Sequence, residues 1–197
     1  MYKQLFKPTH LQEICKQCDL TPSKKYGQNY LISDAPIKKM IEVADIKKTD
    51  TIIEIGPGFG VLTFALAEKA KRVIAFEIER KLQKYWDKNT SENLEVIWGD
   101  ALNKLQDISS TLHEYKVVAN LPYQITSNIL RTLLELENKP ESITVMVQKE
   151  VADRIIAKPR STNSGKVGEM SVLAVSVQYY GEPKIVTKVA KGSFWPA

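Results

Sequence analysis

The segment Asn120-Leu121-Pro122-Tyr123 brings hydrogen-bond acceptors and an aromatic ring together at one point of the chain. It follows an apolar run at residues 115–119, typical of a buried strand, and precedes a helical pattern that begins at Thr126. A strand that ends in this way places acceptors beside a flat stacking surface. This arrangement suits a planar base with an exocyclic amine, because the oxygens accept the amine N–H bonds while the ring stacks on the base.

A glycine-rich segment, Glu54-Ile55-Gly56-Pro57-Gly58-Phe59-Gly60, lies between a predicted strand and a predicted helix. Glycines at such a turn let the backbone approach a ligand closely and direct the N–H groups of the helix N-terminus toward it. The spacing is G-x-G-x-G, whereas a nicotinamide-cofactor fingerprint reads G-x-G-x-x-G. Many turns of this kind are purely structural, so the segment alone excludes no class of ligand.

Two acidic residues end the next two predicted strands and make the interpretation more specific. A carboxylate at Glu77 can accept hydrogen bonds from both hydroxyls of a ribose, and one at Asp100 can accept from an adenine amino group. Each residue taken alone is as readily a helix cap or a surface charge. Together with the glycine turn, they indicate a nucleoside-bearing cofactor that does not require a phosphate.

The elements that would position these residues alternate along the chain as a parallel α/β sheet requires. The expected strands are residues 51–55, 72–77, 94–98, 116–119, 142–148 and 183–190. The expected helices are residues 5–18, 36–44 (capped by Asp34), 61–69, 81–88, 127–136, 150–157 and 169–180, with a surface loop at 158–168. This pattern predicts an α/β fold with a mostly parallel sheet and helices on both faces.

Composition limits the possible classes of protein. The 197 residues are 43% hydrophobic and 26% charged, which suits one well-buried domain, and the net charge of +5 is compatible with a phosphate-rich partner or with an ordinary lysine-rich surface. The cysteines, Cys15 and Cys18, form one C-x-x-C motif, and the histidines are His10 and His113, so no metal site is expected. No apolar run approaches about 18 residues, so we expect no membrane span and a cytoplasmic protein, or an organellar matrix protein after N-terminal processing.

Five segments resemble those of the ribosomal RNA adenine dimethyltransferases, in the same order along the chain. They are Lys24–Leu31, Glu54–Gly60, Asn120–Tyr123, Gln148–Arg154 and Phe194–Pro196. The resemblance implies a Rossmann-like S-adenosylmethionine-dependent methyltransferase fold. It also implies that two adjacent adenosines near the 3′ end of small-subunit rRNA are methylated at N6 during subunit maturation. The implied partner is the immature small subunit, and we expect a monomer.

The resemblance also assigns roles to individual residues. On the cofactor side, Asn29 and Leu31 flank S-adenosylmethionine, Gly56 lies at its methionine end, Gly58 also binds the cofactor, Glu77 binds the ribose, and Asp100 binds the adenine. On the target side, Asn120, Leu121, Pro122 and Tyr123 hold the base, Asn120 also joins the two sites, and Phe194 faces the base from the opposite wall. Six basic residues suit phosphate contacts: Lys24, Lys25, Lys149, Arg154, Lys158 and Arg160.

The family pattern normally continues past Phe194 into a last strand and a small helical RNA-binding domain. The resemblance therefore implies a methyltransferase domain at residues 23–197 that stops before these parts, preceded by a helical extension at residues 1–22. That extension is equally compatible with an RNA contact and with a simple packing helix.

Two other functions remain open at this point. The erythromycin-resistance methyltransferases of large-subunit rRNA share the glycine turn and an N-[IL]-P-Y motif, although residues 24–31 and 148–154 look more like the small-subunit enzymes. The other alternative is a non-catalytic RNA-binding assembly or transcription factor with the same fold. Intact Glu77, Asp100 and Asn120 argue against a lost cofactor site.

Overall fold

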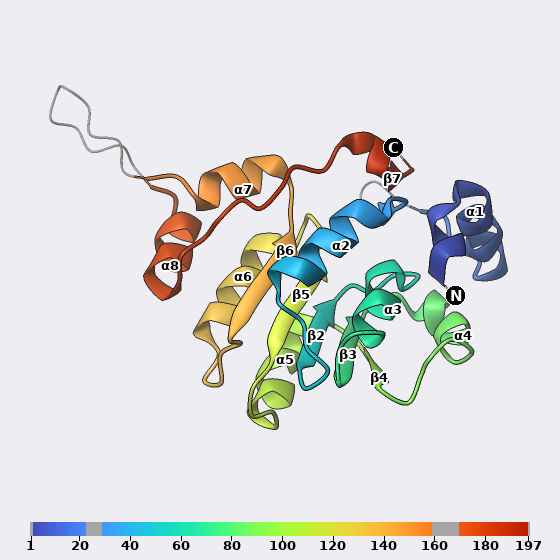
Figure 1. Ribbon diagram of the computed structural model, residues 1–197, viewed down its shortest axis with the longest axis horizontal. Coiled ribbons are helices and arrows are strands. Elements are labelled where there is room, and N and C mark those ends of the chain that lie inside the picture. The colour runs from blue at the N-terminus through green and yellow to red at the C-terminus, as the bar shows by residue number, and fades with distance from the viewer. Residues whose placement is uncertain (1, 23–28, 159–169, 197) are drawn as a thin grey trace, which may run out of the picture.

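The computed structural model describes residues 2–22, 29–158 and 170–196, and a five-stranded parallel sheet forms its centre (Figure 1). The strand order is β4-β3-β2-β5-β6. The chain enters at β2, winds outward to β4, and then crosses to β5 and β6, so the winding direction reverses between β2 and β5. In open parallel sheets, ligands bind beyond the carboxyl ends of the strands at such a reversal. The strands are β2 (Thr51–Ile55), β3 (Arg72–Glu77), β4 (Leu94–Trp98), β5 (Lys116–Asn120) and β6 (Ser142–Met146).

Helices cover both faces of this sheet and give two separate hydrophobic cores. One face packs against η1 (Tyr2–Phe6), α1 (Pro8–Gln17), α2 (Asp34–Val43), α3 (Val61–Ala67) and the short pair η3 (Arg80–Leu82) and α4 (Gln83–Trp86). The other face packs against α5 (Ala101–Ser110), α6 (Thr126–Glu135), α7 (Lys149–Ile155) and α8 (Val172–Tyr180). The central strands are apolar runs because both of their faces are buried. The predicted Rossmann-like arrangement is confirmed.

A second, two-stranded sheet joins segments from opposite ends of the sequence. β1 (Tyr30–Leu31) pairs antiparallel with β7 (Phe194–Trp195), which follows the short turn η4 (Lys191–Ser193). The pairing places Tyr30 opposite Trp195 and Leu31 opposite Phe194. The backbone N–H of Ile32 donates to the carbonyl of Ser193 at 2.7 Å, which extends the contact.

The predicted strand at residues 183–190 is wrong. These residues take no regular secondary structure, and Ile185 and Val186 are 40% and 45% exposed. Their alternating apolar pattern suits a strand, but a strand also requires a neighbouring edge to pair with. Among the described residues β6 ends the sheet, and this segment makes no ladder with it.

Two helix predictions also change in detail. Helix α2 begins at Asp34 itself with Ser33 at the N-cap position, and Asp34 forms an ion pair with Lys38 in place of a cap. The predicted helix at residues 81–88 is a 3₁₀ turn followed by the single turn α4. The predicted loop at residues 158–168 lies almost wholly outside the described residues.

The N-terminal helices pack on the same core as α2 and α3. Leu5, Leu11, Ile14 and Cys15 are buried there. The domain boundary at residue 22 stays a prediction, because the shared core does not define where an extension ends. Within the described parts of the chain, no helix has the length and apolar character to span a membrane.

Candidate functional site

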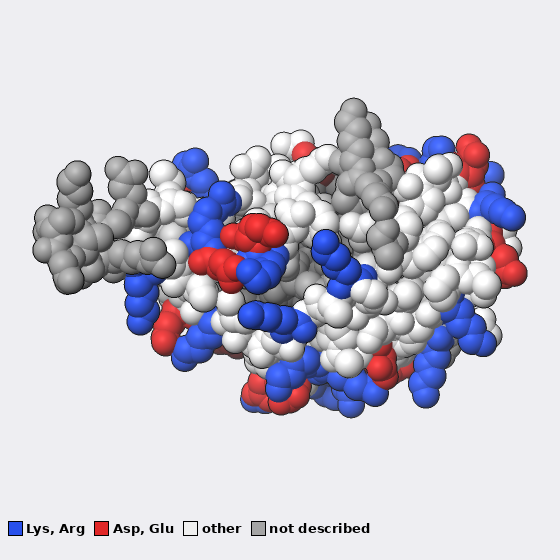
Figure 2. Space-filling model, turned by 90° about the horizontal axis from the view of Figure 1, so that it is seen from above, with Lys and Arg blue, Asp and Glu red and all other residues white. Residues whose placement is uncertain are grey.

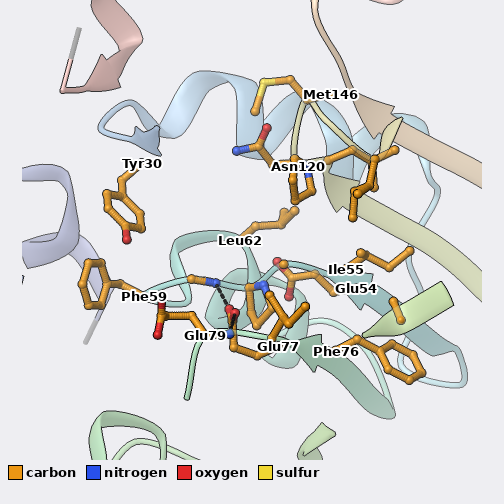
Figure 3. A pocket seen from close by; sticks show the side chains of 18 of the residues that line it. Tyr30, Glu54, Ile55, Phe59, Leu62, Phe76, Glu77, Glu79, Asn120 and Met146 are labelled. Carbon is orange, nitrogen blue, oxygen red and sulfur yellow. Dashed lines mark hydrogen bonds between the residues drawn. The ribbon is translucent and has the colours of Figure 1, made fainter. Parts of the chain in front are cut away.

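A cavity of about 470 Å³ lies beyond the carboxyl ends of β2, β3, β4 and β5, where the winding of the sheet reverses (Figure 3). This volume falls within the range of roughly 300–1,000 Å³ that is typical of small-molecule sites. Ten of the eleven predicted site residues line it: Asn29, Leu31, Gly56, Gly58, Glu77, Asp100, Asn120, Leu121, Pro122 and Tyr123. The structure therefore brings together residues that are up to 94 positions apart in sequence.

Phe194 is the predicted residue that does not line the cavity. It lies one step away, as the backbone partner of Leu31 in the two-stranded sheet. Its side chain packs against the hydrophobic core on the α1–α3 side. Phe194 is thus connected to the cavity through its pairing with the lining residue Leu31, and its role against a target base stays a prediction.

The glycine turn lies against the cavity with its backbone in a conformation that side chains rarely adopt. Gly56 and Gly58 have φ angles of 73° and 55°. A Cβ atom at Gly56 would lie 3.3 Å from Pro122, and one at Gly58 would lie 3.2 Å from the ring of Tyr30. Glycine is therefore required here both by the positive φ and by close packing, and the turn presents bare backbone to the cavity.

Glu77 is held in a fixed orientation at the end of β3. Its Oε2 accepts a hydrogen bond from the backbone N–H of Gly58 at 3.0 Å, and its Oε1 accepts from that of Glu79 at 2.7 Å. The side chain is buried, and burial raises the pKa of this carboxyl while the backbone N–H groups act in the opposite direction. Each carboxylate oxygen can accept a second hydrogen bond, so the group can still receive the hydroxyls of a ribose.

Asp100 serves as a helix cap and also lines the cavity. Its Oδ1 accepts a hydrogen bond from the backbone N–H of Leu102 at 3.0 Å and thereby caps α5. The preceding residue, Gly99, has a φ of 133°, which turns the chain from β4 into the helix. The cap fixes the carboxylate at the edge of the cavity, so the structural and ligand-binding interpretations of Asp100 are compatible.

The turn after β5 is fixed by backbone and side-chain hydrogen bonds. The N–H of Leu121 donates to the carbonyl of Met146 on β6 at 3.1 Å. The carbonyl of Pro122 accepts from the hydroxyl of Thr126 at 3.0 Å, and this anchors the turn to α6. Asn120 projects into the cavity from the end of β5 (Figure 3). The side-chain amide of Asn120 therefore lines the same cavity as the cofactor-side residues and Tyr123.

Tyr30 and Glu54 are among the lining residues to which the sequence assigned no role. Tyr30 forms a side wall: its ring lies 4.6 Å from that of Phe59 and 6.3 Å from that of Trp195, measured between ring centroids. Glu54 is 1% exposed in β2, and burial, with the neighbouring charge of Glu77, raises its pKa to about 8. The sequence did contain a signal for Glu54, because it is the single acidic residue within a strand that was expected to be buried.

Of the six basic residues proposed for phosphate contacts, Lys24, Lys25 and Arg160 lie outside the described residues, and Lys158 is exposed after the end of α7. Lys149 and Arg154 are exposed on α7, where Lys149 forms an ion pair with Asp153 at 2.6 Å and Arg154 donates to the hydroxyl of Ser127 at 3.3 Å. Lysine and arginine side chains are numerous on the face shown in Figure 2, with acidic side chains among them.

Comparison with known proteins extends these observations. The model of a family described as ribosomal RNA adenine dimethylase matches residues 20–197. The ribosomal RNA small subunit methyltransferase A of Dehalococcoides mccartyi strain BAV1 is 42% identical over 191 residues, which cover 94% of this chain and 62% of that protein. Its namesake from Clostridium botulinum strain Langeland is 40% identical over 188 residues, covering 94% and 66%. This chain therefore spans about two thirds of their length or less.

Solved structures give the same picture of the fold. A dimethyladenosine transferase from Plasmodium falciparum superposes with a TM-score of 0.59 at 30% identity, over 75% of this chain and 51% of that one. The 23S rRNA methyltransferase ErmE superposes with a TM-score of 0.51 at 28% identity, over 63% of this chain and 50% of that one.

Proposed function

The chain belongs to the ribosomal RNA adenine dimethylase family, and we propose from this that it is an S-adenosylmethionine-dependent adenine N6-dimethyltransferase. Its proposed substrate is a pair of adjacent adenosines near the 3′ end of small-subunit rRNA, presented by the immature small subunit. We further propose that the protein acts as a monomer in the cytoplasm, or in an organellar matrix if it is processed.

The observation that carries this proposal is the meeting of Asp100, Glu77 and Asn120 at one cavity. Glu77 and Asn120 are the last residues of β3 and β5, and Asp100 follows the end of β4. The glycine turn follows β2, which lies between β3 and β5, so Asp100 and Glu77 are on one side of the turn and Asn120 is on the other. S-adenosylmethionine fits this set, because its adenine and ribose match the two carboxylates and its amino-acid end matches the bare backbone of the turn. When bound, its sulfonium supplies an electrophilic methyl group.

The residues of the target side position a weak nucleophile. The lone pair of adenine N6 is delocalised into the ring, so the amine reacts poorly when it is planar. The side-chain oxygen of Asn120 and the carbonyl of Leu121 would accept its two N–H bonds and favour a pyramidal nitrogen. Pro122 offers no N–H to compete for these acceptors. The chain would thus contribute mainly orientation, which is a large part of catalysis in group transfer.

Tyr123 would stack on the target base after the base leaves its own stack. Stacking of a base on an aromatic side chain contributes about 1–3 kcal/mol, enough to offset part of the cost of unstacking. Phe194 is proposed to face the base from the other side. We assign no catalytic base, since the proton of the amine can leave to solvent after methyl transfer.

The nearest alternative is methylation of large-subunit rRNA, and the likeness to the 23S rRNA methyltransferase ErmE is the observation that favours it. The relatives at 40–42% identity are named for the small subunit and favour the first reading. Purified immature small and large subunits, incubated with the protein and labelled S-adenosylmethionine, separate the two. We expect N6,N6-dimethyladenosine in the small-subunit rRNA alone, and label confined to the large subunit would overturn the proposal.

Calorimetry tests the non-catalytic alternative. An intact cofactor site predicts that S-adenosylmethionine binds with a dissociation constant well below millimolar. A folded protein that shows no binding in this range would favour an RNA-binding factor without methyltransferase activity.

A further inference from the structure

Two neighbouring side chains of α4 hold the backbone of the glycine turn. The hydroxyl of Tyr85 donates to the carbonyl of Phe59 at 2.8 Å, and Nε1 of Trp86 donates to the carbonyl of Gly58 at 3.0 Å. Both acceptor residues line the cavity, whereas neither donor is among the described residues that do so. The two donors can therefore act on a ligand in the cavity through the turn, without touching that ligand.

Gly58 is held by hydrogen bonds at both its N–H and its carbonyl. The N–H donates to Oε2 of Glu77 at 3.0 Å, while the carbonyl accepts from Trp86. A glycine with a φ of 55° has no side chain to restrict its backbone, so these bonds supply the restriction. Because Gly58 also holds the Glu77 carboxylate, a shift of this glycine would move the acceptor proposed for the ribose.

Phe59 is fixed by its ring as well as by its carbonyl. Its ring centroid lies 4.6 Å from that of Tyr30 and 5.5 Å from that of Tyr85, and the second pair is edge-to-face with an interplanar angle of 81°. Edge-to-face contact is a favourable arrangement of aromatic rings. Tyr85 therefore holds Phe59 at two points, and the Phe59 ring packs against the wall formed by Tyr30 (Figure 3).

The segment that carries the two donors is itself fixed in place. A single helical turn such as α4 has little stability in isolation, so its position is set by packing. Leu82 and Trp86 are each 1% exposed and belong to the core on this face of the sheet. Nζ of Lys81 donates to the carbonyl of Asp19 at 2.6 Å and ties the segment to the chain that follows α1. α4 is thus a firm support for the turn.

We propose that Tyr85 and Trp86 are positioning residues for the cofactor, which hold the glycine turn in its binding conformation before the ligand arrives. The inference rests on the proposed function, because that function supplies the ligand. Gly56, Gly58 and Gly60 all have positive φ angles, so a turn without support would sample many other conformations. Ordering a flexible loop on binding lowers affinity, and a loop that is already ordered avoids that cost.

A matched pair of tyrosine variants separates positioning from general stability. Tyr85→Phe removes the hydroxyl that donates to the turn and keeps the ring. Tyr115→Phe is the control, because the Tyr115 hydroxyl also donates to a backbone carbonyl, that of Asn138 at 2.7 Å, but in the core on the opposite face of the sheet. Each variant loses one hydrogen bond and should melt about 2–4 °C below the unaltered protein.

The two variants should differ in their affinity for S-adenosylhomocysteine, the demethylated form of the cofactor. Titration calorimetry should show a dissociation constant that is raised about fivefold or more in Tyr85→Phe and changed less than about twofold in Tyr115→Phe. Equal affinities of the two variants would overturn the proposal.

Steady-state kinetics add a readout that a mere loss of folded protein would not give. The turn holds the cofactor equally in the ground state and in the transition state, so Tyr85→Phe should raise KM for S-adenosylmethionine about fivefold while kcat changes less than about twofold. A lower kcat with an unchanged KM would mean that the variant has lost active protein, and it would contradict positioning.

Trp86→Phe tests the second donor. It removes the indole N–H, keeps an aromatic ring in the core, and should weaken binding of S-adenosylhomocysteine about fivefold or more. Unaltered affinity in this variant would overturn the role of Trp86. If the unaltered protein does not bind S-adenosylhomocysteine, the proposed function itself fails. If it binds and both α4 variants bind equally well, the positioning role alone fails.

Discussion

At the scale of single residues, the buried carboxyl of Glu54 makes the stability of the free protein depend on pH. Its pKa is about 8 in the folded protein against 4.5 for the free side chain. Between these values the unfolded chain is ionised at Glu54 while the folded chain is not. Stability that is present below about pH 4.5 is therefore lost progressively as the pH rises to about 8.

We therefore predict that Glu54→Gln stabilises the free protein at high pH. One pKa unit corresponds to about 1.4 kcal/mol, so the unaltered protein loses a free energy of unfolding of the order of a few kcal/mol at high pH, and the variant avoids this loss. At roughly 2–4 °C per kcal/mol for a chain of this size, the variant should melt at least about 5 °C above the unaltered protein at pH 8.5. At pH 5 the advantage should be much smaller. Glu92→Gln, at an exposed position, is the matched control and should change neither value.

We expect the side chain of Asn120 to contribute more to the rate of methyl transfer than to cofactor affinity. Asn120→Ala removes the amide oxygen proposed to accept from the target amine but leaves Glu77 and Asp100 in place. We expect the rate of methyl transfer to fall by about 100-fold or more, corresponding to roughly 3 kcal/mol of transition-state stabilisation, while affinity for S-adenosylhomocysteine changes less than about fivefold. Single-turnover rates and calorimetry measure the two quantities. Equal losses in both would mean that the residue serves the cofactor alone.

At the scale of elements, the turn between β2 and α3 depends on Gly60. This residue has a φ of 86°, and a Cβ atom there would lie 2.7 Å from the rings of both Phe64 and Trp86. Gly60→Ala should lower the free energy of unfolding by about 2–4 kcal/mol, because overpacking of a core and a left-handed backbone are both costly. Denaturant unfolding measures the loss.

Gly192→Ala is the control for that experiment, since a Cβ atom at Gly192 meets nothing within 4 Å. We expect its free energy of unfolding to stay within about 0.5 kcal/mol of the unaltered protein. If Gly60→Ala were equally neutral, the turn would be more adaptable than its packing against α4 indicates.

The elements show what the sequence alone can predict. β2 through β6 were predicted because each is a short apolar run between turn signals, and burial on both faces produces that pattern directly. Residues 183–190 carry a similar pattern, yet they form no strand, because pairing depends on an edge elsewhere in the molecule. The sequence also gives no local signal for the pairing of residues 30–31 with 194–195, since two-residue strands have no periodicity.

That the predicted residues would gather at one cavity could be expected for a related reason, while their roles stay predictions. Its polar residues fall at the ends of strands, and parallel strands bring those ends to one edge of the sheet. Glu54 lines the same cavity from inside β2, and only the three-dimensional structure shows that its buried Oε2 accepts no hydrogen bond from the described residues. The side wall formed by Tyr30 likewise depends on contacts with Phe59 and Trp195, which are distant in sequence.

At the scale of the whole molecule, one wall of the cavity depends on a contact between residues 30–31 and the C-terminal residues 194–195. Tyr30 and Leu31 line it, and their backbone is held by Trp195 and Phe194. The five-stranded sheet carries the rest of the site and does not include this pairing. The C-terminal residues should therefore control ligand affinity more than they control the stability of the core.

A chain shortened after Ala190 tests this coupling. It lacks β7 and the Ser193 carbonyl that accepts from Ile32, so β1 loses its ladder and Tyr30 loses its contact with Trp195. Each lost hydrogen bond is worth about 0.5–1.5 kcal/mol, so affinity for S-adenosylhomocysteine should fall roughly tenfold or more. Trp195→Phe, which keeps the strand and a ring beside Tyr30, should bind within about threefold of the unaltered protein. Full affinity in the shortened chain would mean that β1 holds its wall of the cavity without help from β7.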